Sequence, residues 1–342
     1  MSASGVYLVM LLSVVIPVYN EQLGIPLLLD VLSPILRRIG CAYEILFVND
    51  GSTDGTLQAL SEYAWRDPRV KIVNLGRNFG HQIAITAGLD LAEGDAVVIM
   101  DSDLQDPPDL LPEMVRLFHQ GFDVVSPQRI SRQSDSLMKR LTAQAFYRIM
   151  RTFVDRRMPP EVGDFRLFSA RAVRALRAMR ECHRFMRGMV TSLGLREITL
   201  PFERRGRAAG ETKYPLKKML SFSWTAITSF SGLPLRMTLG FGFFITGIGC
   251  IYLVWVLYSA LIKHNVVPGW TSLVVLQCLF SGSILIAVGL LGDYVSRIYE
   301  ETKRRPLYIV ESMLNVEIPP REIPGAVILQ PDRTPVERYG EA

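Results

Sequence analysis

Apolar and polar positions follow two alternating periods over the first 128 residues of the chain. Short β-branched, apolar runs predict strands, and stretches with apolar residues three or four positions apart predict helices between them. Strands that alternate with helices are typical of an α/β domain with a doubly wound, mostly parallel sheet. The predicted strands are 11–18, 43–49, 70–74, 95–100 and 122–126, and the predicted helices are about 21–39, 53–66, 78–92 and 108–120.

Polar motifs follow three of the predicted strands. They are PVYNE at 17–21, NDGSTDG at 49–55 and DSDLQDPP at 101–108. Doubly wound sheets bind their ligands beyond the carboxyl ends of the strands. We therefore expect the three motifs to converge on one binding site.

The third motif places Asp101 and Asp103 one residue apart at the end of a buried strand. Residues i and i+2 of an extended backbone point the same way, so both carboxylates are expected to reach one hard cation. Such a pair suits a Mg²⁺ or Mn²⁺ ion that keeps sites open for the diphosphate of a nucleotide. The competing interpretation is an Asp that caps the helix expected from Pro108, which explains one acid but not two.

Two later stretches, Thr238 to Leu261 and Pro268 to Gly292, contain no charged residue. Each is long enough to cross a hydrocarbon core of about 30 Å, so they predict a transmembrane helical hairpin. Basic residues flank the pair, whereas the connection between them holds a single lysine. The positive-inside rule then places both long flanks of the hairpin, and with them the sheet domain and both termini, in the cytoplasm. The apolar run 6–18 follows no Lys or Arg, so we expect a core strand there and no signal peptide.

Charge is divided unevenly along the chain. Residues 1–128 carry 7 basic and 16 acidic side chains, whereas residues 129–218 carry 22 basic and 8 acidic ones. A basic segment beside membrane spans favours anionic lipid groups over nucleic acid as its partner. The four cysteines show no disulfide or zinc spacing, in agreement with a reducing compartment.

The segments after residue 128 are expected to serve the membrane. Apolar residues recur at helical spacing over 137–153 and again over 216–230, each beside basic residues, as in interfacial helices. For the first, an ordinary helix packed on the sheet explains the pattern equally well. We expect a domain at 1–214, a juxtamembrane helix at 215–235, the hairpin at 236–293 and a C-terminal tail at 294–342 that is mostly disordered after Arg305.

Two common nucleotide-binding motifs are absent. The chain contains neither G-x-G-x-x-G nor G-x-x-x-x-G-K-[ST]. A dehydrogenase and a P-loop ATPase are therefore disfavoured.

At this point the chain resembles the family 2 glycosyltransferases of the GT-A fold, a Rossmann-like architecture. Within them it is similar to the polyprenyl-phosphate glycosyltransferases, which include bactoprenol glucosyltransferase and dolichol-phosphate mannose synthase. The likeness covers roughly residues 11–305, and the two-span hairpin resembles the bactoprenol branch. The matching segments are 13–21 (SVVIPVYNE), 48–55 (VNDGSTDG), 74–80 (NLGRNFG), 101–108 (DSDLQDPP) and 210–214 (GETKY).

The resemblance assigns roles to named residues. It implies that the nucleotide sugar is bound by Pro17, Tyr19, Glu21, Asp50, Asp101 and Ser102, and the metal by Asp101, Asp103 and Gln105. For Asp50 a purely structural role is the alternative, in which its Asp-Gly turn caps the next helix. Thr53 or Asp54 can perform that capping instead. Catalytic roles fall to Asp103 and to Asp164, which would act as a base or orient the acceptor. A structural ion pair between Asp164 and Arg166 or a neighbouring arginine is the competing account. The acceptor phosphate would be held by Arg129, Arg140 and Lys213, each of which also fits a solvated surface.

The implied reaction is the inverting transfer of one sugar to polyprenyl phosphate of the undecaprenyl type. The expected donor is UDP-glucose, with GDP-mannose or a UDP-aminoarabinose-type donor as alternatives, at the inner (plasma) membrane of a cell whose envelope uses the product. A Q-x-x-R-W motif, which processive synthases carry, is absent where the chain reads HRFMRG at 183–188, so a single transfer is favoured. The alternative from a different functional class is a protein that binds the nucleotide sugar or the lipid phosphate without turnover. A flippase or channel is less well supported, because neither span holds an ionisable group. The family often forms homo-oligomers.

Overall fold

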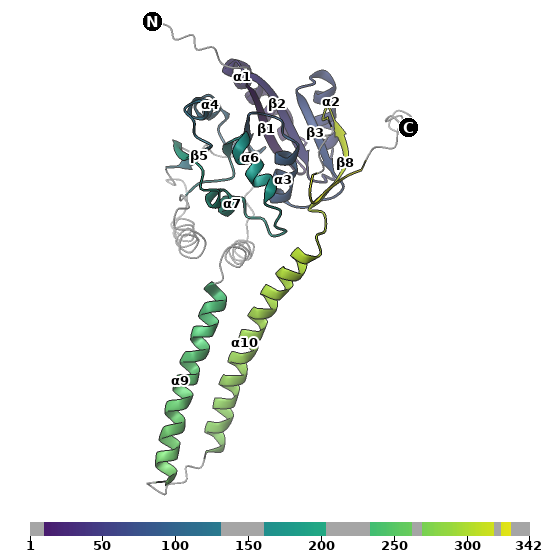
Figure 1. Cartoon of the computed structure of the whole chain (residues 1–342). Helices are drawn as coiled ribbons and strands as arrows, with labels where there is room; N and C mark the ends of the chain where they lie inside the picture. The colour runs from purple at the N-terminus through teal and green to yellow at the C-terminus, as the bar shows by residue number, and fades with distance from the viewer. Residues whose placement is uncertain (1–9, 131–160, 203–232, 262–268, 318–322, 330–342) are drawn as a thin grey trace, which may run out of the picture. The chain divides into compact units, whose positions relative to one another are not determined.

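The computed structural model describes residues 10–130, 161–202, 233–261, 269–317 and 323–329. They divide into two compact units, one built on a sheet and one formed by two long helices (Figure 1). The strands are β1 (Leu11–Val18), β2 (Ala42–Asn49), β3 (Val70–Leu75), β4 (Ala96–Ile99), β5 (Val124–Arg129), β6 (Arg166–Ser169), β7 (Glu197–Phe202), β8 (Tyr308–Leu314) and β9 (Ala326–Ile328). The helices are α1 (Gly24–Ile39), α2 (Thr56–Arg66), α3 (His81–Leu91), the 3₁₀ turn η1 (Pro108–Leu110), α4 (Leu111–His119), α6 (Ala170–Ala178), α7 (Met186–Ser192), α9 (Leu233–Leu261) and α10 (Trp270–Thr302).

The first five strands and four helices lie where the apolar pattern predicts them, within a few residues at their ends. The sheet has the order β7-β5-β6-β4-β1-β2-β3-β8-β9. Its centre is parallel, because β1 pairs in parallel with both β2 and β4, and β2 with β3. The sheet is mixed toward its margins, where β6 runs antiparallel to both β4 and β5 and β8 runs antiparallel to β3. The prediction of an α/β, mostly parallel sheet is confirmed in the centre, and the antiparallel strands are additions to it.

Helices cover both faces of the sheet. Alternate residues of β1, among them Leu12 and Val14, belong to one buried cluster with apolar residues of α1, α2 and α4. The opposite face of β1 contacts α3, where a Cβ on Gly88 would lie only 2.2 Å from Cγ1 of Val15. A glycine at 88 therefore allows α3 to lie directly against the strand. This contact matters for the site because the amino end of α3 carries His81 and Gln82.

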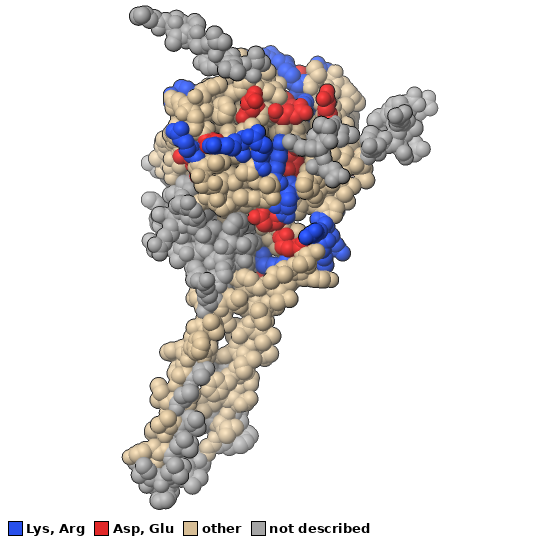
Figure 2. All heavy atoms as spheres, in the orientation of Figure 1, with Lys and Arg blue, Asp and Glu red and all other residues tan. Residues whose placement is uncertain are grey.

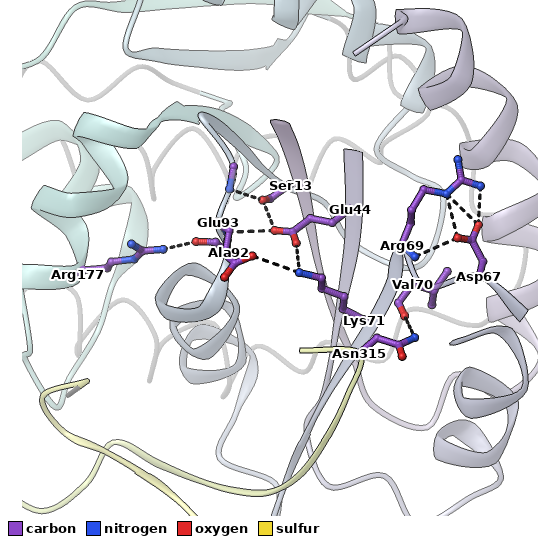
Figure 3. A network of polar contacts seen from close by, with 11 residues as sticks. Ser13, Glu44, Asp67, Arg69, Val70, Lys71, Ala92, Glu93, Arg177 and Asn315 are labelled. Carbon is purple, nitrogen blue, oxygen red and sulfur yellow. Dashed lines mark hydrogen bonds and ion pairs between the residues drawn. The ribbon is translucent and has the colours of Figure 1, made fainter. Parts of the chain in front are cut away.

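A buried polar network ties the amino ends of the first three strands together (Figure 3). Glu44 of β2 accepts a hydrogen bond from Ser13 of β1 and pairs with Lys71 of β3, whose Nζ lies 2.6 Å from its Oε2. The Gly94 amide donates to Ser13 Oγ at 2.8 Å, which fixes the turn before β4. Because Glu44 bonds to a residue of β1 and to a residue of β3, we assign the network to the alignment of the strands.

The prediction of a mostly disordered tail after the long helices is wrong for residues 308–314. These residues form β8, with Tyr308 and Val310 fully buried and Ile309 exposed between them. The composition of the tail suggested disorder, but this two-residue alternation gives the strand one buried face while its backbone pairs with β3. Residues that precede and follow α9 and α10 thus build one sheet.

The second unit consists of α9 and α10, which contact each other near Gly249 and Phe280. Both present exposed apolar side chains, and in Figure 2 charged side chains are sparse on this unit and gather on the sheet unit. Within the described residues, one helical stretch, Phe280–Thr302, is long and apolar enough to cross a membrane, and Met237–Gly249 is a shorter apolar stretch. The stretch Phe280–Thr302 begins later than the predicted second span at 268–292. The two-span hairpin therefore stays a prediction.

Candidate active site

The site lies at the carboxyl ends of the central strands, where the sequence motifs were expected to meet. Two of the motif loops are joined directly. The Thr53 amide donates to Asn20 Oδ1 at 2.8 Å, and the Asn20 amide donates to Ser52 Oγ at 2.9 Å. The loop after β1 and the loop after β2 therefore form one rim of the site.

The rim carries the residues that the sequence assigns to the nucleotide. Pro17 is buried at the end of β1, whereas Tyr19 is 45% exposed. Glu21 is partly exposed, and its backbone amide donates to Thr56 Oγ1 at 2.9 Å. An exposed aromatic ring beside hydrogen-bonded loops is a surface on which a planar base can stack.

Asp50 has a different environment from the one expected. It is buried, and its two oxygens accept the backbone amides of Phe79 at 2.7 Å and Gly80 at 2.9 Å. Asp50 thus fixes the loop that begins α3. The N-cap residue of α2 is Gly55, and Asp54, one residue before it, accepts the Thr56 amide on its Oδ1 at 3.0 Å. Asp54 rather than Asp50 therefore satisfies the first amide of α2.

The acidic motif forms a tight turn beyond β4. The Asp101 amide donates to Asp106 Oδ2 at 3.2 Å, and the Gln105 amide donates to Asp103 Oδ1 at 3.1 Å. Leu104 has φ +56°, in the left-handed region that tight turns use. Since β4 ends at Ile99, the extended-backbone argument for Asp101 and Asp103 is wrong. The turn itself keeps Asp101, Ser102 and Asp103 partly exposed and Gln105 buried.

The register of β4 and β6 brings a third carboxylate to Asp101. The two strands are antiparallel, with Ile99 opposite Arg166. Continuing that register by two residues places Asp164 opposite Asp101. His81 lies between them, with Nε2 3.5 Å from Asp101 Oδ1 and 3.7 Å from Asp164 Oδ2.

The charges around these groups shift their pKa values. Burial lowers the pKa of His81, but the Asp164 and Asp101 carboxylates outweigh it, so the imidazole pKa is raised. Burial raises the pKa of Asp101, and the charges of Asp164 and Asp103 add to this effect. Burial also opposes ionisation of Asp164, yet Arg187 and His81 hold its pKa well below the usual range. Asp164 is therefore an ionised carboxylate at neutral pH.

Asp164 is held from two sides. Gln82 Nε2 donates to its Oδ2 at 3.0 Å, and Arg187 Nε donates to its Oδ1 at 3.1 Å. The predicted ion-pair partner Arg166 contributes charge, but its Nε donates to the Gly163 carbonyl at 3.1 Å. The ion pair predicted as the competing account of Asp164 is therefore present, with Arg187 as its partner. Asp164 also lines a pocket, so the ion pair does not exclude a role in the chemistry.

A pocket of about 250 Å³ lies beside these groups and is lined by both carboxylates and arginines. Arg129, predicted to hold the acceptor phosphate, lines it together with Asp101 and Asp164. Arg140 and Lys213, the other two candidates, lie outside the described residues. The remaining lining residues are Asp106, Pro127, Glu161, Val162, Gly163, Phe165, Arg187 and Phe202.

The residues that could bind a metal ion lie in the acidic turn at 101–106. Among the described residues no group of three or more His, Cys, Asp or Glu side chains forms a ready-made metal cage. However, Asp101 Oδ1 is buried and, among the described residues, has no hydrogen-bond partner, although His81 Nε2 lies 3.5 Å from it as an ion-pair partner. One or two carboxylates plus substrate phosphates are the usual ligands of Mg²⁺, so this turn fits an ion that arrives with a diphosphate.

Sequence reasoning missed His81, Gln82 and Arg187. His81 and Gln82 directly follow the NLGRNFG segment, and Arg187 lies in the HRFMRG segment that was used only to exclude processive synthases. Polar residues at the first turn of a helix beyond a parallel strand were the available signal for the first two. For Arg187 no local signal exists, because its contact depends on how α7 packs.

Comparisons with known proteins identify the family of the chain. The glycosyl transferase family 2 model matches residues 13–177, which run from within β1 into α6 and include Asp164. Over 305 residues the chain is 44% identical to an uncharacterized glycosyltransferase, YkcC, of Bacillus subtilis (strain 168), covering 89% of this chain and 94% of that protein. It is 36% identical over 302 residues to a prophage bactoprenol glucosyl transferase homolog of Escherichia coli (strain K12), covering 88% of this chain and 99% of that protein.

Among solved structures, a glucosyl-3-phosphoglycerate synthase from Mycobacterium tuberculosis in complex with Mn²⁺, UDP and glucosyl-3-phosphoglycerate is similar at 21% identity and a TM-score of 0.47. That match covers 64% of this chain and 78% of the other. YkcC and the prophage bactoprenol glucosyl transferase homolog are 44% and 36% identical to this chain along nearly their whole length, and that degree of identity places the chain within their family. The chain is a glycosyltransferase and belongs to glycosyl transferase family 2.

Proposed function

We propose that this GT-A enzyme transfers one glucose, with inversion, from UDP-glucose to a polyprenyl phosphate at the cytoplasmic face of a membrane. The observation that carries the proposal is the pocket that Asp101, Asp164 and Arg129 all line. Carboxylates in such a pocket suit a metal-bound donor, and arginines suit an anionic acceptor. The relatives named for bactoprenol glucosyl transfer support the choice of sugar and lipid.

On the donor side, Asp101 and Asp103, with Gln105 of the same turn, would hold a Mg²⁺ or Mn²⁺ ion. When bound, the ion would neutralise charge that develops on the leaving diphosphate. Tyr19 and the loops around it would position the nucleotide base. Ser102 lies between the two carboxylates and would contact the donor there.

On the acceptor side, Arg129 and Arg187 would draw the lipid phosphate into the pocket. A phosphate monoester has its second pKa near about 6, so the attacking oxyanion is largely formed at neutral pH. A strong base is then unnecessary, which agrees with the depressed pKa of Asp164. We assign Asp164 the task of orienting the acceptor and the arginines around it.

The membrane proposal rests on α9 and α10. A lipid acceptor dissolves in the bilayer, so an enzyme that uses it benefits from an anchor of its own. The exposed apolar surfaces of both helices support a two-span hairpin with the sheet unit in the cytoplasm.

The test uses the full chain, purified in detergent, with undecaprenyl phosphate and Mg²⁺ or Mn²⁺. UDP-glucose, GDP-mannose and a UDP-aminoarabinose-type donor are offered separately, and the lipid product is detected by mass. A glucosylated lipid from UDP-glucose alone is the expected result. Transfer from another donor alone would replace the sugar in this proposal.

A nucleotide-binding protein without turnover is the alternative of a different class. It would bind the nucleotide sugar in the same assay without forming any lipid-linked product. The paired acids and the ionised Asp164 in the pocket favour turnover, since simple binding needs no carboxylate opposite the donor.

A further inference from the structure

Gln82 occupies the first turn of α3 and uses both ends of its side-chain amide. Its Oε1 accepts the backbone amide of Met186 at 2.9 Å, and its Nε2 donates to Asp164 Oδ2 at 3.0 Å. The orientation of the amide follows from chemistry, because the reverse orientation would face an oxygen with a carboxylate and an N–H with an N–H. Gln82 is therefore locked in one direction.

These bonds close a ring. Met186 begins α7, and the next residue, Arg187, donates from Nε to the other oxygen of Asp164 at 3.1 Å. The ring thus runs from Gln82 to Asp164, to Arg187, along the chain to Met186 and back to Gln82. Asp164 and Arg187 both line the pocket, so the ring fixes the distance between an anionic and a cationic group of the site.

The ring also joins segments that no shared strand pairing holds together. Gln82 lies on α3, Asp164 lies just before β6, and α7 follows the loop after α6. The first amide of α7 has no side-chain cap from its own N-cap residue, Phe185. Gln82 supplies that missing acceptor, and Met186 itself is buried.

We propose that Gln82 is a positioning residue for sugar transfer, which holds the Asp164 carboxylate and the Arg187 guanidinium in the arrangement that the acceptor requires. The inference rests on the proposed function of the same pocket. A conventional packing role is the alternative, and it predicts loss of stability without a selective effect on turnover.

The experiment compares three variants of the full chain in detergent. Gln82→Met keeps the length of the side chain and removes both bonds of the ring. Gln82→Glu keeps the acceptor for Met186 but sets a carboxylate against Asp164. Thr86→Val is the matched control, because it removes the bond from Thr86 Oγ1 to the Gln82 carbonyl on the same buried helix and leaves the ring intact.

Two readouts are taken. For Gln82→Met we expect kcat to fall about 10- to 100-fold, as is typical when a supporting partner of a functional group is lost, with the donor KM within about threefold of wild type. Gln82→Glu should lose at least as much, and Thr86→Val should keep both constants. Hydrogen exchange should rise over residues 183–188 in Gln82→Met and stay unchanged in Thr86→Val.

The two readouts also separate failures. An unchanged kcat in Gln82→Met, or an equal loss in Thr86→Val, would overturn the positioning role. If wild type transfers no sugar from any donor, the proposed function fails, and hydrogen exchange alone tests whether Gln82 holds the ring together. Protection of residues 183–188 that is lost in Gln82→Met then supports the ring, and unchanged protection refutes it.

Discussion

The Tyr308 hydroxyl donates a 2.8 Å hydrogen bond to Asp90 Oδ2, which joins residues 218 positions apart in the chain. Both side chains are buried, and Arg180 Nη1 donates to both oxygens of Asp90 at 2.9 Å. Burial and the neighbouring Asp90 charge raise the pKa of Tyr308, so the phenol stays protonated as a donor. Through this bond, the strand that follows the two long helices is fixed to the far end of α3.

We predict that Tyr308→Phe destabilises the sheet unit. The substitution keeps the buried ring but leaves Asp90 with one partner fewer, at a cost of about 1–3 kcal/mol for a buried charged acceptor. Thermal unfolding of the full chain in detergent measures it, with Tyr19→Phe, at an exposed position, as the control. Equal transition temperatures for the two variants would contradict the role given to this bond.

Asp101→Asn and Asp103→Asn should each abolish metal-dependent transfer. A bound cation supplies several kcal/mol of charge stabilisation, so a loss of about a hundredfold or more in turnover is expected. Initial rates are measured across a Mg²⁺ or Mn²⁺ titration. Asp109→Asn, an exposed acid in η1, is the matched control and should retain wild-type rates. Activity that survives in both Asp101→Asn and Asp103→Asn would refute the metal assignment.

Gly88→Ala should destabilise the protein because its methyl group would lie 2.2 Å from Cγ1 of Val15. Overpacking of this kind typically costs about 1–3 kcal/mol. The double variant Val15→Ala with Gly88→Ala provides space for the methyl group and should recover part of the loss. If the double variant loses as much unfolding free energy as the two single variants together, or more, close contact with β1 is not the cause.

Asp123 predicts a dependence of stability on pH. Its hydrogen bonds from Arg171 lower its pKa, and its Oδ1 accepts a further bond from Ser169 Oγ at 2.9 Å. An Asp carboxyl has a pKa of about 3.9 in the unfolded chain. When its pKa in the folded protein is lower, the carboxylate stabilises the fold at pH values above the unfolded pKa, and this stabilisation is lost as the pH falls through the folded pKa.

Asp123→Asn tests this dependence. Wild type should be more stable than Asp123→Asn at pH 7, and the difference should shrink as the pH falls below about 4. Unfolding midpoints of both proteins over pH 3 to about 7 give the comparison. A difference that is constant over this range would mean that the carboxylate charge plays no part.

The centre of the fold was predictable because its strands are short, β-branched and bounded by turn residues. Val14, Ile16 and their neighbours are buried on both faces, so the run alone indicates a central strand. β8 was not predictable from composition, since its strand character depends on Tyr308 and Val310 reaching a sheet edge that the chain forms more than two hundred residues earlier.

For the site, the sequence predicted that the loops after the central strands meet, and the structure joins the loops after β1 and β2 and places Asp101, Asp164 and Arg129 around one pocket. It did not predict what Asp50 does, because an acid in an Asp-Gly turn can bind a ligand or hold a loop equally well. His81 and Arg187 were missed for a related reason. Their partners are set by the antiparallel register of β4 and β6 and by α7, which no local pattern encodes.

The position of β8 has a consequence for synthesis of the chain. Until α9 and α10 have been made, β3 is an edge strand with unpaired backbone groups, and such edges readily pair with other chains. At about 5–20 residues per second the nascent sheet waits many seconds for its missing neighbour. A protein shortened before α9 to make it soluble would keep that open edge permanently, so a well-behaved truncation must rejoin the segment that carries β8 to the first unit through a linker.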